Sequence, residues 1–204
     1  MSTLEHNYNL ALQRSPDICE HIPTLKNYAL ECEHITEMGV RAVNSTWGLL
    51  AGKPKRMISY DLYFAGPPVF PDADIASVFE AAREEDIVYG FIQASSLTAN
   101  IEPTDLLFLD TWHVYEQLSK ELLYHADKVK KYIILHDTEA FKTSGEFYQE
   151  WIDNAPFKVS LNKGLWEAIE EFLDRNKHKW ELHEHYTNQN GLTILKRKLD
   201  TYEL

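Results

Sequence analysis

Two short apolar runs in this chain each lead into a carboxylate and a histidine. The first run ends at Asp110, with His113 three residues on, and the second ends at His136 and Asp137. These side chains bind divalent cations and transfer protons near neutral pH. Runs that are apolar throughout predict strands buried on both faces, as in a parallel sheet covered by helices. Because ligands bind outside the carboxyl ends of parallel strands, we expect these four residues to gather on one rim.

Alternating strand and helix patterns predict the scaffold of that rim. Strands are expected at residues 34–38, 56–61, 87–93, 106–110, 132–136, 180–186 and 192–198. Helices are expected at residues 5–14, 23–32, 45–51, 72–85, 114–129 and 165–176, with a short one near 147–152. A short Asn/Gly turn joins the last two strands, so they must form an antiparallel hairpin. The pattern predicts a Rossmann-like three-layer α/β sandwich, whose seven-stranded sheet is mostly parallel and ends in that hairpin.

Composition limits the class of protein. The 204 residues suit a single domain, with a helical lead-in over 1–30 and a core over 31–198. The net charge of −12 disfavours a nucleic-acid partner. With two cysteines, no secretory signal and no apolar run long enough for a membrane span, we expect a cytoplasmic protein without a disulfide framework.

Polar residues also mark the ends of the first three strands. Gly39 permits a close backbone approach before a helix N-terminus, where a carboxylate or phosphate could dock. Asp61, about 20 residues further on, suits the hydroxyls of a ribose. Ser95 and Ser96 could read an adenine edge. Each could instead be an ordinary turn or cap, and the case lies in their order along the chain.

With these features in place, the chain resembles class I S-adenosylmethionine-dependent methyltransferases. More narrowly, it resembles small methyltransferases found with glycan and natural-product biosynthesis genes. The resemblance covers roughly residues 30–198 and is carried by residues 36–41, 44–50, 58–61, 105–116, 133–138 and 164–169.

The resemblance implies S-adenosyl-L-methionine as the cofactor. Glu37 and Gly39 would flank its methionine portion, Asp61 would hold the ribose, and Ser95 or Ser96 would approach the adenine. The other residues expected at the cofactor are Arg41, Asn44, Ser45, Asp110 and Trp112. The family's turn usually carries more than one glycine, whereas residues 41–43 here are Arg, Ala and Val. Such a loop could bind through its backbone, or it could mark a non-catalytic relative.

Methyl transfer requires that the acceptor be aligned with the methyl group and that its proton be removed or masked. A general base or a divalent metal could do this for a hydroxyl. Asp110 and Asp137 match the acids that hold the metal in metal-dependent relatives, and could share Mg²⁺ or another divalent cation. His113 and His136 could complete the ligand sphere or act as base. Alternatively, Asp110 and His113 could cap a helix, and His136 could be a core histidine.

The leading hypothesis is an O-methyltransferase acting on a sugar, a glycan or another small hydroxylated acceptor. Trp112, Trp166 and Tyr115 could stack on such an acceptor. The chain could also form a homo-oligomer or be a module of a larger glycan-modifying protein. A non-catalytic binding or scaffold domain is the first alternative. An NAD-dependent oxidoreductase is the second, although the terminal hairpin and the sparse glycines argue against it.

Overall fold

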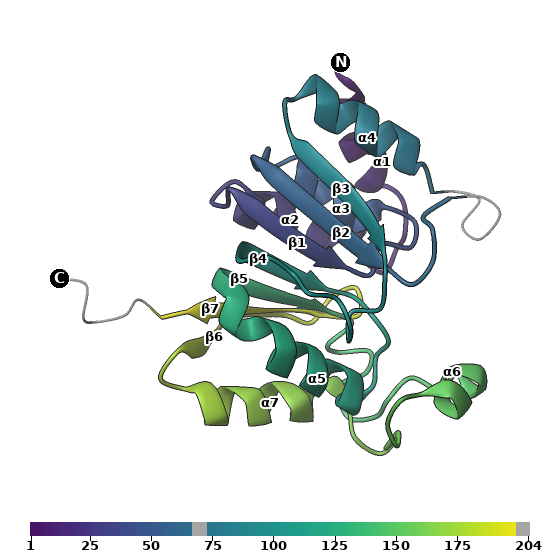
Figure 1. Ribbon diagram of the computed structural model, residues 1–204, viewed down its shortest axis with the longest axis vertical. Helices are drawn as coiled ribbons and strands as arrows, with labels where there is room; N and C mark the ends of the chain where they lie inside the picture. Colours follow the sequence, from purple (N-terminus) through teal and green to yellow (C-terminus); the bar gives the residue numbers. More distant parts are fainter. Residues whose placement is uncertain (67–72, 199–204) are drawn as a thin grey trace.

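The computed structural model describes residues 1–66 and 73–198, and a seven-stranded sheet forms its middle layer (Figure 1). The strands are β1 (His34–Met38), β2 (Arg56–Asp61), β3 (Val88–Gln93), β4 (Thr104–Leu109), β5 (Val129–His136), β6 (Trp180–Tyr186) and β7 (Leu192–Arg197). Their order is β3-β2-β1-β4-β5-β7-β6. The first five are parallel, whereas β7 runs antiparallel to both β5 and β6. The predicted fold, including the terminal hairpin, is therefore confirmed.

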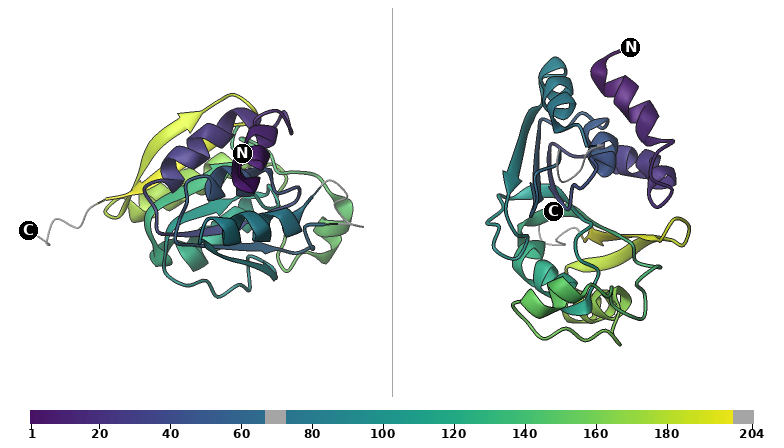
Figure 2. Two further views of the ribbon diagram at one scale, coloured as in Figure 1. Left: turned by 90° about the horizontal axis from the view of Figure 1, so that it is seen from above. Right: turned by 90° about the vertical axis from the view of Figure 1, so that its right-hand side faces the viewer.

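Helices cover both faces of the sheet. They are α1 (Thr3–Ala11), α2 (Ile22–Ala29), α3 (Asn44–Leu50), α4 (Ile75–Glu84), α5 (Tyr115–His125), α6 (Gln149–Asn154) and α7 (Leu165–Asn176), with short 3-10 turns η1 (Cys19–His21) and η2 (Ala126–Lys128). One apolar cluster packs the four helices α1, α2, α3 and α4 against one face of the sheet. A second cluster packs α5 and α7 against the other face. Figures 1 and 2 show these layers, with the lead-in helices opposite α5 and α7.

The central strand β4 is completely buried. All six residues of β4 are buried, because β1 and β5 flank the strand and helices cover both its faces. This explains the unbroken apolar run before Asp110. The strand begins earlier than predicted, at Thr104, and Asp110 is the first residue beyond it.

Several predicted helix bounds shift by a few residues because polar side chains cap the helices. Ser2 accepts a hydrogen bond from the backbone N–H of Glu5, so α1 begins before residue 5. Asp74 accepts one from Ser77, and α4 begins at Ile75. The start predicted at residue 72 lies outside the described residues. Both caps satisfy N–H groups that a helix cannot pair internally.

One part of the sheet lacks a helical cover. Residues 94–103, which connect β3 to β4 and are described throughout, form turns and no helix. On the face that α5 and α7 cover further along, Val88 and Ile92 are consequently 62% and 44% exposed. Figure 1 shows β2 and β3 open toward the viewer there.

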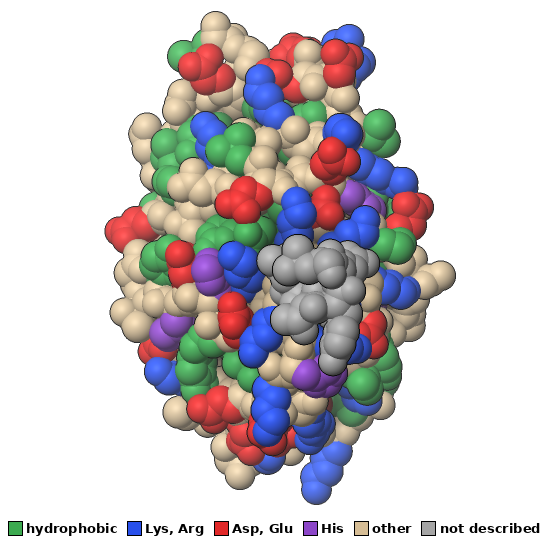
Figure 3. Space-filling view, turned by 90° about the vertical axis from the view of Figure 1, so that its left-hand side faces the viewer, with side chains coloured by type: hydrophobic (Ala, Val, Ile, Leu, Met, Phe, Trp, Pro, Cys, Tyr) green, Lys and Arg blue, Asp and Glu red, His purple; other side chains and the backbone are tan. Residues whose placement is uncertain are grey.

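The surface carries charges of both signs. Acidic and basic side chains are interspersed on the face shown in Figure 3, so the negative excess of the chain is not gathered there. Among the described helices, none is both long and apolar enough to cross a membrane.

Candidate functional site

The predicted rim forms at the ends of β4 and β5. Leu109 and Leu135 are register partners in these parallel strands, so the residues that follow them lie side by side. The Nε2 atom of His113 lies 3.2 Å from Oδ1 of Asp110 and 2.9 Å from Oδ2 of Asp137. One ligand atom from each of the three residues lies within 4.8 Å of the other two. Two carboxylates and an imidazole converging in this way form a donor set suited to a divalent cation.

Glu146 completes the surroundings of His113 and was missed by the sequence analysis. Its Oε2 atom lies 3.0 Å from Nδ1 of His113, while the ring of Phe141 stacks on the imidazole at 4.7 Å. The backbone N–H of Glu146 also donates to the carbonyl of His113. A carboxylate that accepts from one ring nitrogen leaves the other free for a metal. No sequence signal marks Glu146, because it lies in an irregular loop 33 residues away.

His136 is almost completely buried behind the two aspartates. Its Nε2 atom donates to the backbone carbonyl of Asp17 at 3.0 Å. That bond directs Nδ1 toward Asp110 Oδ2 and Asp137 Oδ1, at 3.5 and 3.4 Å. Among the described residues, neither this Nδ1 nor Asp137 Oδ1 has a well-formed hydrogen bond. Buried polar atoms without partners are costly, and a bound cation would satisfy the aspartate.

The charges of the cluster are coupled. Burial lowers the pKa of His136, but Asp110, Asp137 and the bond to the Asp17 carbonyl together outweigh it and raise the pKa to about 9. Burial likewise opposes protonation of His113, yet its bonds to Asp110, Asp137 and Glu146 raise its pKa well above the ordinary value. For Asp110 burial favours the neutral acid, but the two histidines hold its pKa below the ordinary value. Without a metal, imidazolium groups therefore balance the carboxylates.

Gly39 brings the loop after β1 against this cluster. Its φ is +88°, and a Cβ atom at this position would overlap with the carbonyl oxygen of Asp110. Asp110 in turn donates its backbone N–H to Met38 at 2.9 Å. The glycine is thus required where the ends of β1 and β4 approach each other.

Two residues of this loop other than glycine adopt backbone conformations that are usual for glycine. Arg41 and Val43 have φ values of +43° and +59°, in the left-handed region that glycine usually occupies. Asp61 holds the loop, because Oδ2 accepts from the backbone N–H groups of Val40 and Arg41 at 2.7 and 3.0 Å. Its Oδ1 accepts from Tyr63. A ribose contact of Asp61 stays a prediction.

Glu37 and Ser45 lie beneath the loop and bond to each other. The fully buried carboxylate of Glu37 accepts from Ser45 at 2.7 Å, from Thr46 at 3.0 Å and from Ser59 at 2.6 Å. Burial raises the pKa of Glu37 to about 7, although the three hydroxyls lower it. In this arrangement both residues support the loop from inside, and their contacts with a cofactor stay a prediction.

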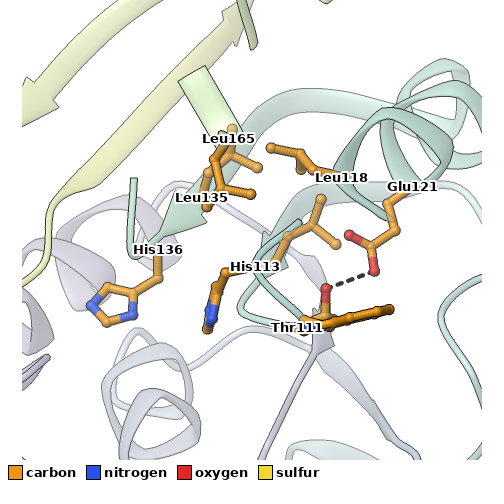
Figure 4. A pocket seen from close by; sticks show the side chains of 9 residues that line it. Thr111, His113, Leu118, Glu121, Leu135, His136 and Leu165 are labelled. Carbon is orange, nitrogen blue, oxygen red and sulfur yellow. Dashed lines mark hydrogen bonds between the residues drawn. The ribbon is translucent and has the colours of Figure 1, made fainter. Parts of the chain in front are cut away.

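The expected adenine region is held by a second buried acid, Glu121, which the sequence analysis also missed. Its Oε1 atom accepts from Ser96 at 2.6 Å, from Thr111 at 2.7 Å and from Gln117 at 2.7 Å. Figure 4 shows Thr111 and Glu121 bonded beside a cavity of about 10 Å³, which has room for about one water molecule. Glu121 thereby joins the loops after β3 and β4.

The remaining predicted contacts are spread along the rim. Ser95 is half-buried, and its hydroxyl accepts from the backbone of Leu97. Trp112 stacks on Phe157 with ring centroids 6.0 Å apart and meets Trp151 edge-on. Asn44 donates to the hydroxyl of Ser15 at 2.5 Å and so joins the loop after β1 to the lead-in.

Comparisons with known proteins identify the type of fold. No family model and no curated sequence matches the chain. Solved structures do match, at low identity. The O-methyltransferase of Bacillus cereus in complex with S-adenosylhomocysteine is 18% identical, with a TM-score of 0.57, and the match covers 96% of this chain and 90% of the other. The fold is that of the class I methyltransferases.

Two further structures with this methyltransferase fold agree. The O-methyltransferase TomG of Streptomyces achromogenes, in complex with S-adenosylmethionine, has a TM-score of 0.58 at 10% identity, and the match covers 97% of this chain and 90% of TomG. A methyltransferase of Podospora anserina bound to S-adenosylhomocysteine has a TM-score of 0.55 at 14% identity, covering 97% and 88%. In the methyltransferase fold, the rim described above is the face at which ligands are expected.

Proposed function

We propose that this protein transfers a methyl group from S-adenosyl-L-methionine to a hydroxyl group of a small acceptor, with a divalent cation held by Asp110, His113 and Asp137. The observation that carries the proposal is the convergence of these three residues at the strand ends of a class I methyltransferase fold. Solved structures of this fold with S-adenosylmethionine or S-adenosylhomocysteine support the choice of cofactor.

The chain has the features needed to receive this cofactor. The loop after β1 keeps a glycine-type path through Gly39, Arg41 and Val43, and Asp61 holds it from the end of β2. When bound, S-adenosylmethionine supplies an electrophilic methyl group. The protein's part is to orient that group toward the acceptor and to exclude water.

The metal proposal is consistent with the hydrogen bonds around each ligand. Glu146 accepts from Nδ1 of His113, which leaves Nε2 free to bind a cation between the two aspartates. A divalent cation at this place would lower the pKa of an acceptor hydroxyl. His136 and the carbonyl of Asp17 would hold the aspartates in place from behind. If the reaction uses no metal, His113 would instead act as the general base that removes the proton of the acceptor hydroxyl.

The acceptor side of the rim is aromatic. Trp151 of α6 packs between Trp112 and Tyr148, and Phe147 and Tyr148 are both exposed. Helix α6 has no buried residue and projects from the body of the molecule in Figure 1. Such rings can stack on the apolar face of a sugar. A sugar or glycan hydroxyl therefore remains our proposed acceptor.

One observation favours the alternative of a non-catalytic binding domain. Both carboxylate oxygens of Asp61 are already bonded to backbone N–H groups. If they cannot be released, the ribose would lose its expected partner.

Calorimetric titration of S-adenosylhomocysteine into the protein, with and without Mg²⁺, tests the proposal first. Micromolar binding would support it and would lead to assays of labelled methyl transfer to a panel of sugars and phenols. If the protein bound no S-adenosylhomocysteine in either condition, the methyltransferase proposal would be withdrawn. Binding without transfer to any acceptor would favour the non-catalytic domain.

A further inference from the structure

The turn at residues 15–18 connects the lead-in to both sides of the candidate site. The carbonyl of Ser15 accepts from the backbone N–H groups of Ile18 and Cys19, which closes the turn. The hydroxyl of Ser15 accepts from Asn44 in the loop after β1, while the carbonyl of Asp17 accepts from His136 at the end of β5. The turn therefore joins the loop after β1, where the methionine portion of the cofactor is expected, to the end of β5.

The carboxylate of Asp17 has an unused acceptor in this turn. Its Oδ1 atom is buried and has no hydrogen-bond partner among the described residues. Its Oδ2 atom lies 3.9 Å from Nη1 of Arg41, too far for a hydrogen bond. A buried carboxylate oxygen without a donor is unfavourable, so this atom is suited to a ligand that brings one.

Arg41 offers the opposite charge beside it. Its side chain is 78% exposed, against 36% for Asp17, so the guanidinium can donate hydrogen bonds to a second partner. Ser15 and Arg41 have left-handed φ values of +48° and +43°, a backbone conformation that residues other than glycine rarely adopt. Strain of this kind tends to persist at binding sites.

We propose that Asp17 binds the α-ammonium group of the methionine portion of S-adenosylmethionine, and that Arg41 binds its α-carboxylate. This inference rests on the proposed function. An α-amino acid presents a cation and an anion on one carbon, and the Asp17–Arg41 pair presents the complementary charges side by side. The ammonium supplies the donors that Oδ1 lacks, and a guanidinium matches a carboxylate in shape and charge.

Ligands that lack one charge at a time test the proposal. S-adenosylhomocysteine carries both charged groups, decarboxylated S-adenosylmethionine lacks the carboxylate, and 5′-methylthioadenosine lacks both. Each is titrated into the unchanged protein, Asp17→Asn and Arg41→Gln. The control is Glu20→Gln, an acid of the same lead-in whose carboxylate accepts from Asn188 instead. Thermal midpoints without ligand show that each variant is folded.

We expect Asp17→Asn to lower the affinity for S-adenosylhomocysteine and for the decarboxylated ligand by about ten- to a hundredfold. This is the effect of losing a hydrogen bond to a charged group. Methylthioadenosine carries neither charged group, so its affinity should be the same for Asp17→Asn as for the unchanged protein. Arg41→Gln should lower the affinity for S-adenosylhomocysteine only, because the other two ligands lack the carboxylate.

The possible failures can be told apart. Unchanged affinity of Asp17→Asn for S-adenosylhomocysteine would overturn this inference and leave the proposed function standing. Equal weakening of all three ligands would also overturn it, since the turn would then act only through the shape of the site. Absence of binding to the unchanged protein would overturn the proposed function and this inference together.

Discussion

Nε2 of His113 lies 2.9 Å from Oδ2 of Asp137, so an imidazole from one strand end reaches the carboxylate of the next. The same atom lies 3.2 Å from Oδ1 of Asp110. When His113 is protonated, its single positive charge is shared between both acids, and His136 pairs with the same two carboxylates from behind. A divalent cation bound to these residues would require the neutral ring, so metal binding should release a proton from the cluster.

Replacement of either aspartate should disable this cluster. We expect Asp110→Asn and Asp137→Asn each to lower turnover at least about tenfold, because an amide is a weaker ligand and carries no charge. Steady-state assays with Mg²⁺, combined with calorimetry of Mn²⁺ binding, measure both effects. Asp127→Asn, which alters an exposed acid paired with Lys179 elsewhere on the molecule, is the matched control. Near-normal rates in either site variant, with or without chelator, would rule out the metal site.

Gly39→Ala should be strongly destabilising. The new Cβ would overlap with the carbonyl oxygen of Asp110, and φ at this position is +88°. We expect a loss of about 2–4 kcal/mol in the free energy of unfolding, measured by urea denaturation. Gly90→Ala is the control, since its Cβ would meet only the flexible end of Ile58. Similar losses at the two positions would show that the contact between β1 and β4 has no special role.

The buried carboxyl of Glu37 should make stability depend on pH. Its pKa is about 7 in the folded protein, against an ordinary value of 4.5. Its stabilising contribution is therefore complete below 4.5 and is lost as the pH rises through 7. The loss amounts to up to about 3 kcal/mol. Urea denaturation at pH 5 and pH 8, with Glu37→Gln as reference, isolates it. A stability difference between the two proteins that does not change with pH would contradict the assignment.

Arg41→Gly should stabilise the protein without ligand. Arg41 is exposed and has a φ of +43°, which glycine adopts without strain. We expect a gain of up to about 1 kcal/mol. Arg41→Ala is the control, because it removes the guanidinium but keeps a Cβ in the left-handed region. If both variants changed the thermal midpoint equally, the effect would come from the lost charge instead.

Local patterns were sufficient for most of the fold. The predicted bounds of β1, β2, β6 and α7 coincide with the structure, with Gly39 directly after β1 and Gly164 directly before α7. The four rim residues could be grouped from the sequence for a related reason: parallel strands bring their carboxyl ends to one edge. Bounds set by capping side chains, as at α1 and α4, were less accurate.

The partners of these residues were beyond the reach of local patterns. Glu146 bonds to His113 although 33 residues separate them along the chain. For the bond between Asp17 and His136 the separation is 119 residues, and for that between Glu121 and Ser96 it is 25 residues. These contacts depend on how a loop, a lead-in turn and a helix pack against the sheet. The spacing of residues along one strand or helix carries no record of that packing.

The sequence by itself determined the sheet, its terminal hairpin and the edge at which carboxylates and histidines gather, because periodicity and strand direction are local properties. Only the tertiary structure decided which atoms each side chain meets. It turned Glu37 and Ser45 inward beneath the loop, and it placed Asp17 beside Arg41. The reason is physical: a side chain's partner depends on the close packing of segments far apart in the chain, and the free energy of that packing belongs to the assembled fold.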